Sequence, residues 1–498
     1  SEMCIRDSFC SVCNTVKLWK NFRIPFMSAN KMLNLFLTLF FCSIVAAQDS
    51  NPNFIIVMAD DLGIGDIGLY GSELIDTPNL DRMASEGIYF ESFYASANVC
   101  TASRGGLLTG RYPIRLGLVD DVARPSNDIH LTESEITIAE ALKQEGYSTA
   151  LFGKWHLGAR VEWYPLNHGF DEFYGILYSN DMWPKHPQQG SVFNFPDISL
   201  YENETPIRIL EDQTFLTSAL TEKAIAFIKK NKDAPFFVYL PHPQPHVPLF
   251  AAEAFQNTQD RGLYGDVISE IDNSVGQILN TLKEEGIDEN TIIVFTSDNG
   301  PWLSYGAHSG SPGIFREGKG TNWEGGHRVP AIVRYPKEIN TNTVIETPAM
   351  GIDWLPTLVE FTNSNYPDKK IDGASLVPLL TGQNKETPHD NFFFYYRTNE
   401  LHAVRHKDWK LYVPHTYRSL NGRQGSNDGF PVSYDINEIN APELYNLILD
   451  PSENINIAGT HPELVAKISK IADSIRLILG DRLTGVKGSE VRPVGRID

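Results

Sequence analysis

The sequence predicts an α/β fold built on a large, mostly parallel central sheet with helices on both faces. Four short apolar runs have the length and composition of strands that are covered on both faces, at residues 54–58, 148–152, 236–240 and 291–295. Segments with helical periodicity lie between these runs. Strands that alternate with helices are typical of parallel sheets, whose functional sites lie beyond the carboxyl ends of the strands.

The first helix is expected over residues 79–86, with Thr77 as its N-cap and Pro78 at its first position. A second helix is expected after Thr132 and Glu135, which have the spacing of a capping box. Helical periodicity is also present at residues 212–230 and 263–285. These segments supply the helices that the predicted sheet requires.

Residues 32–47 resemble a secretion signal. A lysine precedes a short apolar stretch, and Val45 and Ala47 are the small residues that a signal peptidase reads. The stretch is too short for a stable membrane anchor. We therefore expect residues 1–47 to be a non-native leader and a signal peptide that is removed before Gln48, which implies a periplasmic or secreted protein.

Composition narrows the class of partner and draws attention to one cysteine. The 498-residue chain has a formal net charge of −20, which argues against nucleic acid and anionic membranes as partners. Four of its five cysteines lie in or before the expected signal, so Cys100 is left without a partner for a disulfide. A lone thiol of this kind is either a buried apolar residue or a group kept for chemistry.

Acidic residues follow two of the expected strands. Asp60 and Asp61 come soon after residues 54–58, and Asp298 and Asn299 soon after residues 291–295. Converging carboxylates repel one another unless a cation neutralises them. Because all the ligands offer oxygen and no zinc spacing is present, Ca²⁺ or Mg²⁺ is favoured over zinc. Either pair alone is more typical of a turn or a helix cap.

Three basic residues lie beside glycines, at Arg104, Lys154 and Lys319. Glycine allows the backbone to approach a ligand closely, and a helix that begins near residue 103 directs free N–H groups toward an anion. In an acidic protein, cations grouped near a metal site indicate a tetrahedral oxyanion substrate. The alternative for each residue alone is a solvated basic side chain.

Two histidines also follow strand ends, where an imidazole can transfer protons near neutral pH. His156 follows residues 148–152, and His246 follows residues 236–240. His242 competes with His246 for the same role, and the sequence leaves that choice open.

Residues 100–111 resemble the signature of the type I sulfatases, in which C-x-P-S-R and a downstream L-T-G-R direct oxidation of the cysteine to formylglycine. This chain has Ala102 where that signature has proline. Further matching motifs lie at residues 59–63, 77–82, 153–158, 175–181, 296–300 and 318–326, and they resemble the arylsulfatase A group most. The resemblance covers nearly the whole chain after the signal.

The resemblance implies an alkaline-phosphatase-like α/β sandwich with a smaller C-terminal subdomain of antiparallel sheet and helix. The expected boundaries are residues 48–375 for the catalytic domain and 376–498 for the subdomain. Antiparallel strands of the subdomain are expected within residues 392–413, and residues 443–451 resemble its closing segment.

The resemblance also implies the reaction and its residues. A sulfate monoester, either an aryl sulfate or a sulfated carbohydrate, is cleaved by a formylglycine hydrate at Cys100 through a sulfated enzyme intermediate. The implied metal is Ca²⁺, which is favoured over Mg²⁺, and its implied ligands are Asp60, Asp61, Cys100, Asp298 and Asn299. The implied sulfate-binding residues are Arg104, Lys154, Ser179, His246 and Lys319. His246, with Lys319 nearby, protonates the leaving alcohol, and His156 removes the proton from the remaining hydroxyl. A formylglycine-generating enzyme is the implied maturation partner.

Two alternatives stay open at this point. Phosphonate and phosphodiester hydrolases share the superfamily, and a non-catalytic binder of sulfated glycans would keep Cys100 as a thiol. Leaving-group contacts are expected from loops at residues 178–190, at residues 300–316 and around His415. The sequence does not identify the natural ester, exo or endo action, or the oligomeric state.

Overall fold

The computed structural model describes residues 51–118, 121–364 and 369–492. The expected signal peptide and the expected mature start at Gln48 lie outside this part of the chain. None of the helices in the described part is both long enough and apolar enough to cross a membrane.

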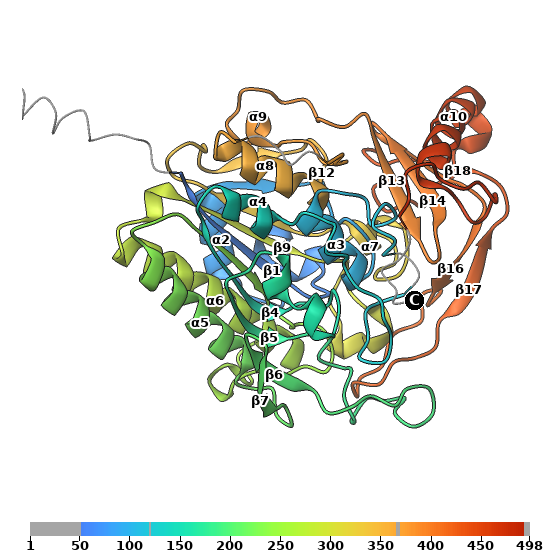
Figure 1. Cartoon of the computed structure of the whole chain (residues 1–498). Coiled ribbons are helices and arrows are strands. Elements are labelled where there is room, and N and C mark those ends of the chain that lie inside the picture. The colour runs from blue at the N-terminus through green and yellow to red at the C-terminus, as the bar shows by residue number, and fades with distance from the viewer. Residues whose placement is uncertain (1–50, 119–120, 365–368, 493–498) are drawn as a thin grey trace, which may run out of the picture. The chain divides into compact units, whose positions relative to one another are not determined.

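A ten-stranded sheet forms the centre of the fold (Figure 1). In spatial order its strands are β11 (Thr343–Ile345), β2 (Ile88–Phe90), β10 (Ala331–Arg334), β9 (Thr291–Ser297), β1 (Asn53–Ala59), β8 (Phe236–Pro241), β4 (Ser148–Lys154), β5 (Glu172–Ile176), β6 (Ser199–Glu202) and β7 (Thr205–Ile209). The central strands from β9 to β5 are all parallel to one another. The four apolar runs are thus confirmed as neighbouring strands, and the mostly parallel sheet is confirmed.

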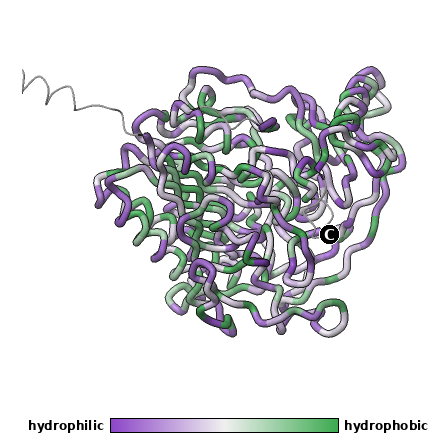
Figure 2. The backbone as a smooth tube through the Cα atoms, viewed as in Figure 1, coloured by the Kyte–Doolittle hydropathy of each residue, from purple (hydrophilic) through white to green (hydrophobic). Residues whose placement is uncertain are grey.

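Helices cover both faces of this sheet (Figure 1). One group consists of α2 (Pro78–Ser85), α5 (Leu216–Asn231) and α6 (Leu263–Glu284), and the other of α3 (Cys100–Thr109), α4 (Ile138–Gln144) and α8 (Trp354–Phe361). The apolar side chains of the central strands are buried between the two groups, and Figure 2 shows hydrophobic residues concentrated there. The expected helices at residues 79–86, 212–230 and 263–285 are confirmed within a few residues.

The expected capping box at Thr132 and Glu135 is wrong. The N-cap of α4 is Thr137, whose Oγ1 accepts the N–H of Glu140 at 3.1 Å, while the Glu140 carboxylate accepts the N–H of Thr137 at 2.8 Å. The same spacing of residue types recurs five positions along the chain. The carboxylate of Glu135 instead forms a buried ion pair with Arg111, so it is not available to a helix end.

The C-terminal part contains a four-stranded antiparallel sheet, as expected from residues 392–413 and 443–451. In spatial order its strands are β13 (Asn391–Tyr396), β14 (Glu400–His406), β15 (Trp409–Tyr412) and β18 (Glu443–Asn446). Helix α10 (Pro462–Leu479) packs on β14 and β15, and β16 (His415–Ser419) pairs with β17 (Asp435–Ile439). The smaller elements are β3 (Phe93–Tyr94), β12 (Ala349–Met350), α7 (Glu324–His327) and α9 (Val377–Leu380). The domain boundary at residues 375 and 376 stays a prediction.

Candidate functional site

The predicted site residues converge beyond the carboxyl ends of the central strands. Each of the five parallel strands is followed by at least one of them: β1 by Asp60 and Asp61, β9 by Asp298 and Asn299, β8 by His246, β4 by His156, and β5 by Ser179. Cys100 begins α3, and Lys319 lies in the loop before α7. The topology therefore brings together residues that are up to 259 positions apart, as expected for a parallel sheet.

The acidic residues form one buried cluster. The N–H of Asp61 donates to Oδ1 of Asp298 at 3.1 Å, and Nδ2 of Asn299 donates to Oδ1 of Asp61 at 2.7 Å. Single ligand atoms of Asp60, Cys100 and Asp298 lie within 4.8 Å of one another. Burial and the charge of Asp60 both raise the pKa of Asp298, so the cluster is electrostatically strained by its own carboxylates.

This cluster fits a hard divalent cation. Oδ1 of Asp60 and Oδ1 of Asn299 are buried and accept no hydrogen bond from any described residue. Buried polar atoms nearly always have a partner, so two acceptor oxygens without one indicate a ligand that binds oxygen. Carboxylate and amide oxygens are the ligands that Ca²⁺ prefers.

Three cations surround the acidic cluster. Arg104 donates from Nε to Oδ2 of Asp298 at 2.9 Å, Lys154 contacts Asp60 through Nζ, and Lys319 donates to Oδ1 of Asp61 at 2.7 Å. Burial alone would lower the pKa of the Arg104 guanidinium, but the two carboxylates Asp298 and Asp60 outweigh it and raise the pKa. Asp61 likewise raises the pKa of Lys319 despite its burial, so Arg104 and Lys319 stay charged in buried positions.

Cys100 lies between the acidic and basic groups. Its Sγ is buried and 4.0 Å from Nζ of Lys319, and it is a free cysteine. Thr101, next in α3, donates from Oγ1 to the carbonyl oxygen of His156 at 3.0 Å, which fixes the start of the helix against the loop after β4. Burial raises the pKa of the Cys100 thiol, although Lys154 and Lys319 act in the opposite direction.

The two histidines have defined proton positions. Nε2 of His156 is 2.9 Å from the carbonyl oxygen of Ala123, and Nδ1 of His246 is 2.6 Å from that of Val247. A carbonyl oxygen can only accept, so these nitrogens carry the hydrogens. Nδ1 of His156 and Nε2 of His246 are left to act on a ligand. Burial, with Lys154 and Arg104, holds the pKa of His156 well below its usual range, so this imidazole is neutral.

The structure also decides between the two histidines that the sequence left as alternatives. His246 lines the same cavity as Cys100, with Nε2 3.6 Å from Oδ2 of Asp61. His242 is fully buried beside α6, where its Nε2 is 3.2 Å from Oγ of Ser274. His242 is therefore a structural residue.

A cavity of about 300 Å³ opens onto this cluster. The predicted residues that line it are Cys100, His156, Ser179, His246 and Lys319. The other predicted residues are buried and do not line it. Polar lining residues that the sequence analysis did not name individually include Arg124, Asp181, Tyr396 and Arg418, of which only Asp181 lies in an expected leaving-group loop, at residues 178–190. Asp181 ends the matching motif at residues 175–181, which is a usable signal, whereas no local pattern marks the other three.

The expected leaving-group loops reach this cavity only in part. His186 and Trp302 line it, and Trp302 also lies against Lys319, with Nζ 4.6 Å from the ring centroid. Trp183 instead packs against Phe250. His415 is buried and stacks on the ring of another histidine, His402. The C-terminal part reaches the cavity through Arg418 and Tyr396.

Comparison with known proteins gives a consistent result. A family model described as Sulfatase matches residues 52–364. Models for the C-terminal parts of N-sulphoglucosamine sulphohydrolase and of aryl-sulfatase match residues 315–418 and 387–481. These matches extend over both parts of the described fold.

Individual relatives match over most of their length. Arylsulfatase A of Bos taurus is 34% identical over 453 residues, with 87% of this chain and 88% of that protein covered. N-acetylgalactosamine-6-sulfatase of Canis lupus familiaris is 35% identical, with 86% of each covered. A crystal structure of a sulfatase from Pseudoalteromonas sp. superposes with a TM-score of 0.77 at 26% identity, and covers 89% of this chain and 93% of its own.

Proposed function

The chain belongs to the sulfatase family and is a sulfuric ester hydrolase, and we propose that it cleaves an aryl sulfate or a sulfated carbohydrate with a formylglycine made from Cys100. The observation that carries this proposal is the position of Cys100 between two unpartnered buried oxygens and three buried cations. A thiol alone gives a sulfated product with no easy exit. An aldehyde hydrate at position 100 would supply one hydroxyl to attack sulfur and a second to expel sulfate.

The basic residues bind the sulfate group. Lys319 and Ser179 line the cavity beside Cys100 and would donate to sulfate oxygens. Lys154 and Arg104, which are buried and do not line the cavity, add positive charge near the sulfate position. Nζ of Lys154 is 3.1 Å from Oγ of Ser179. Because these donors are fixed by buried contacts, they stabilise negative charge that develops on the sulfate oxygens without reorganising.

The two histidines would transfer protons in different steps of the reaction. His246, protonated at Nε2, would donate a proton to the oxygen of the leaving alcohol. His156 would accept a proton at Nδ1 from a hydroxyl at position 100, since its Nε2 is held by Ala123. The different hydrogen bonds of the two rings support this division of roles.

We also propose a Ca²⁺ site formed by Asp60, Asp61, Asp298 and Asn299, with Mg²⁺ as the less favoured ion. Bound there, the cation would neutralise the carboxylates and act as a Lewis acid toward a sulfate oxygen. Removal of Ca²⁺ with EGTA is expected to lower Tm, because the free energy of folding loses the binding term, about 2.7 kcal/mol at a hundredfold excess over Kd. Differential scanning calorimetry measures the shift.

Two matched variants distinguish Ca²⁺ binding at this site from a general effect of Ca²⁺ on Tm. Asp298→Asn is expected to abolish the Ca²⁺-dependent change in Tm, whereas Asp260→Asn, at an exposed position, keeps it. A Tm that EGTA leaves unchanged in the natural protein would contradict the calcium site.

Export and maturation complete the proposal. The support is the secretion signal expected at residues 32–47 and the signature at residues 100–111, which a formylglycine-generating enzyme would read. Intact mass spectrometry of the exported protein tests both, because it reports the N-terminus and whether position 100 carries an aldehyde. Because this chain has Ala102 where the signature has proline, the extent of conversion at position 100 must be measured before any kinetic comparison.

The reaction itself is tested by rates on matched esters. With conversion at position 100 established by mass, 4-nitrophenyl sulfate is expected to be hydrolysed with kcat/KM at least about tenfold above 4-nitrophenyl phosphate and the phosphate diester. A higher kcat/KM on either phosphorus ester would favour the phosphonate or phosphodiester hydrolases instead. A Cys100 that is retained entirely as a thiol after export, measured by intact mass, would favour the glycan binder.

A further inference from the structure

A second cavity adjoins the catalytic one. Its volume is about 290 Å³, just below the roughly 300–1,000 Å³ that is usual for small-molecule sites. The two cavities share four lining residues, Val99, Asp121, Val122 and Tyr396. The second cavity is therefore adjacent to the one that contains Cys100, with these four residues at the boundary between them.

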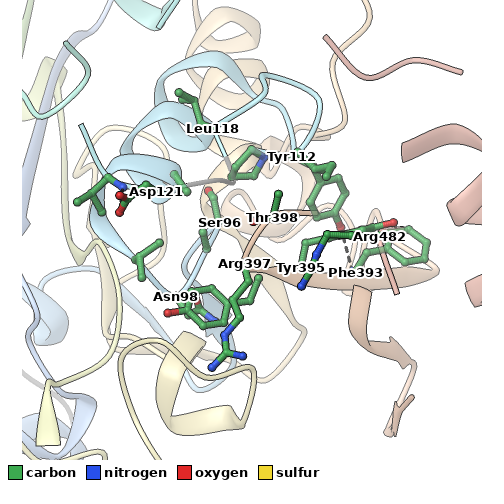
Figure 3. Close-up of a pocket in the computed structure, with 17 residues that line it drawn as sticks. Ser96, Asn98, Tyr112, Leu118, Asp121, Phe393, Tyr395, Arg397, Thr398 and Arg482 are labelled. Atoms are coloured by element: carbon green, nitrogen blue, oxygen red, sulfur yellow. Dashed lines mark hydrogen bonds between the residues drawn. The ribbon is translucent and has the colours of Figure 1, made fainter. Parts of the chain in front are cut away.

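Two distant parts of the chain form the walls of this second cavity. The lining residues come from residues 96–122 and from residues 393–398 with Arg482, and Figure 3 labels members of both groups, with Tyr112 beside Phe393. The aromatic residues are held in place, because the N–H of Phe393 donates to the Tyr112 hydroxyl at 3.3 Å and the Tyr395 hydroxyl donates to the Gly480 carbonyl at 3.1 Å. Rigid aromatic walls suit the apolar face of a sugar ring.

Arg397 gives this cavity a positive charge. Its Nη1 donates to Oγ1 of Thr416 at 3.0 Å, and no carboxylate of the described residues forms an ion pair with it. Arg482, on the same wall, is neutralised by Glu400. Arg397 is only half-buried and lies in the turn between β13 and β14 with φ of 46°, a left-handed conformation that is costly for arginine. An unpaired guanidinium in this position is suited to bind an anion through two parallel hydrogen bonds.

Ala102 links the second cavity to the catalytic cysteine. It lies in the first turn of α3, two residues after Cys100, and it lines the second cavity rather than the catalytic one. The resembling signature has proline at this position. The departure of the sequence from the signature thus falls at a residue that lines the second cavity.

Resting on the proposed function, we propose that the second cavity binds an anionic sugar residue next to the sulfated one, so that the preferred substrate is a sulfated glycan rather than an isolated aryl sulfate. Arg397 binds the carboxylate or sulfate of that residue, and Tyr112, Phe393 and Tyr395 contact its ring. The sulfate that is cleaved stays in the catalytic cavity, so Arg397 acts on specificity and not on the chemical step.

The test compares four substrates with the fully converted enzyme. They are a sulfated hexosamine, that hexosamine linked to a hexuronic acid, the methyl ester of this disaccharide, and the hexosamine linked to a sulfated neutral hexose. A higher kcat/KM for the free acid than for its ester assigns a carboxylate ligand. A preference for the sulfated hexose over the single hexosamine assigns a sulfate ligand. Equal kcat/KM for all four substrates would overturn the inference.

Arg397→Gln identifies the residue responsible. A charge-assisted hydrogen bond contributes about 1.5–3 kcal/mol, so this variant is expected to lose about tenfold to a hundredfold in kcat/KM on the preferred disaccharide. Its kcat/KM on the single hexosamine is expected to be unchanged. Arg208→Gln, at an exposed position of β7, is the matched control. Equal losses on every substrate would contradict a role in the second cavity.

Filling the cavity gives an independent measurement. Thr398 is exposed at its edge, so Thr398→Trp is expected to fold, to lower kcat/KM on the disaccharide and to spare the single hexosamine. An unchanged preference for the disaccharide in this variant would overturn the inference. Failure of the natural enzyme on every sulfate ester would instead overturn the proposed function.

Discussion

Replacement of Cys100 by alanine is expected to lower kcat/KM on any sulfate ester by at least about 10⁴-fold, because it removes the only proposed nucleophile. The fold is expected to be unaffected. Among the described residues, the hydrogen-bond partner of Cys100 Sγ is Nζ of Lys319 at 4.0 Å, and that lysine keeps both of its hydrogen bonds to Asp61. Steady-state kinetics of the purified variant measures the loss.

Two further measurements separate the loss of chemistry from the loss of structure. Tm is expected to change little, since a single buried sulfur atom is removed. Binding of an uncleaved sulfate ester, followed by calorimetry, is expected to persist because Ser179, His246 and Lys319 still line the cavity. Turnover within tenfold of the natural enzyme would show that another group attacks sulfur.

The sequence predicted the convergence of most candidate site residues, because these residues follow strands that are easy to identify. Residues such as Asp60 and Asp298 come directly after apolar runs that are buried on both faces, and a parallel sheet places the ends of such strands together. His246 was preferred over His242 by resemblance alone. The structure separates them through a contact with α6, which no local pattern reports.

Other features could not be predicted because they depend on contacts between distant segments. Thr132 and Thr137 both begin a capping-box pattern, and the correct one is set by the use of Glu135 in an ion pair with Arg111. Arg397 and Arg418 lie on a turn and on a paired strand of the C-terminal part. Their approach to the cavities follows from how that part packs on the central sheet, which composition and periodicity do not specify.

Lys410→Met is expected to lower the free energy of unfolding by about 3–5 kcal/mol, because it removes the cation that the buried carboxylates of Glu324 and Glu453 share, while Glu324 keeps its ion pair with Arg328. Nζ of Lys410 donates to Oε1 of Glu324 and to the carbonyl oxygen of Asn322, each at 2.8 Å, and is 3.5 Å from Oε1 of Glu453. All three charged side chains are buried. Denaturation in urea measures the loss, and Lys470→Met, at an exposed position of α10, is the matched control.

Lys410 and its buried partners connect the C-terminal sheet to the loop that carries Lys319, so Lys410→Met is also expected to lower activity. Lys410 is in β15, whereas Asn322 and Glu324 follow Lys319 within a few residues. Loosening this segment would displace Lys319 from the position where we propose that it binds sulfate, which is expected to raise KM in addition to lowering stability. Unchanged KM alongside a large loss of stability would show that the network stabilises the fold without positioning Lys319.

The stability deficit is expected to depend on pH in a definite direction. Burial raises the pKa of Glu453 to about 7, with Glu324 adding to the effect and Lys410 opposing it. An acid whose pKa is raised in the folded protein loses stability as pH rises from its unfolded value through its folded value. Without Lys410 the pKa of Glu453 rises further, so the deficit is expected to be larger above about pH 8 than below about pH 6. A deficit that is constant across this range would mean that Glu453 stays ionised, and that the cost of Lys410→Met comes from Glu324 alone.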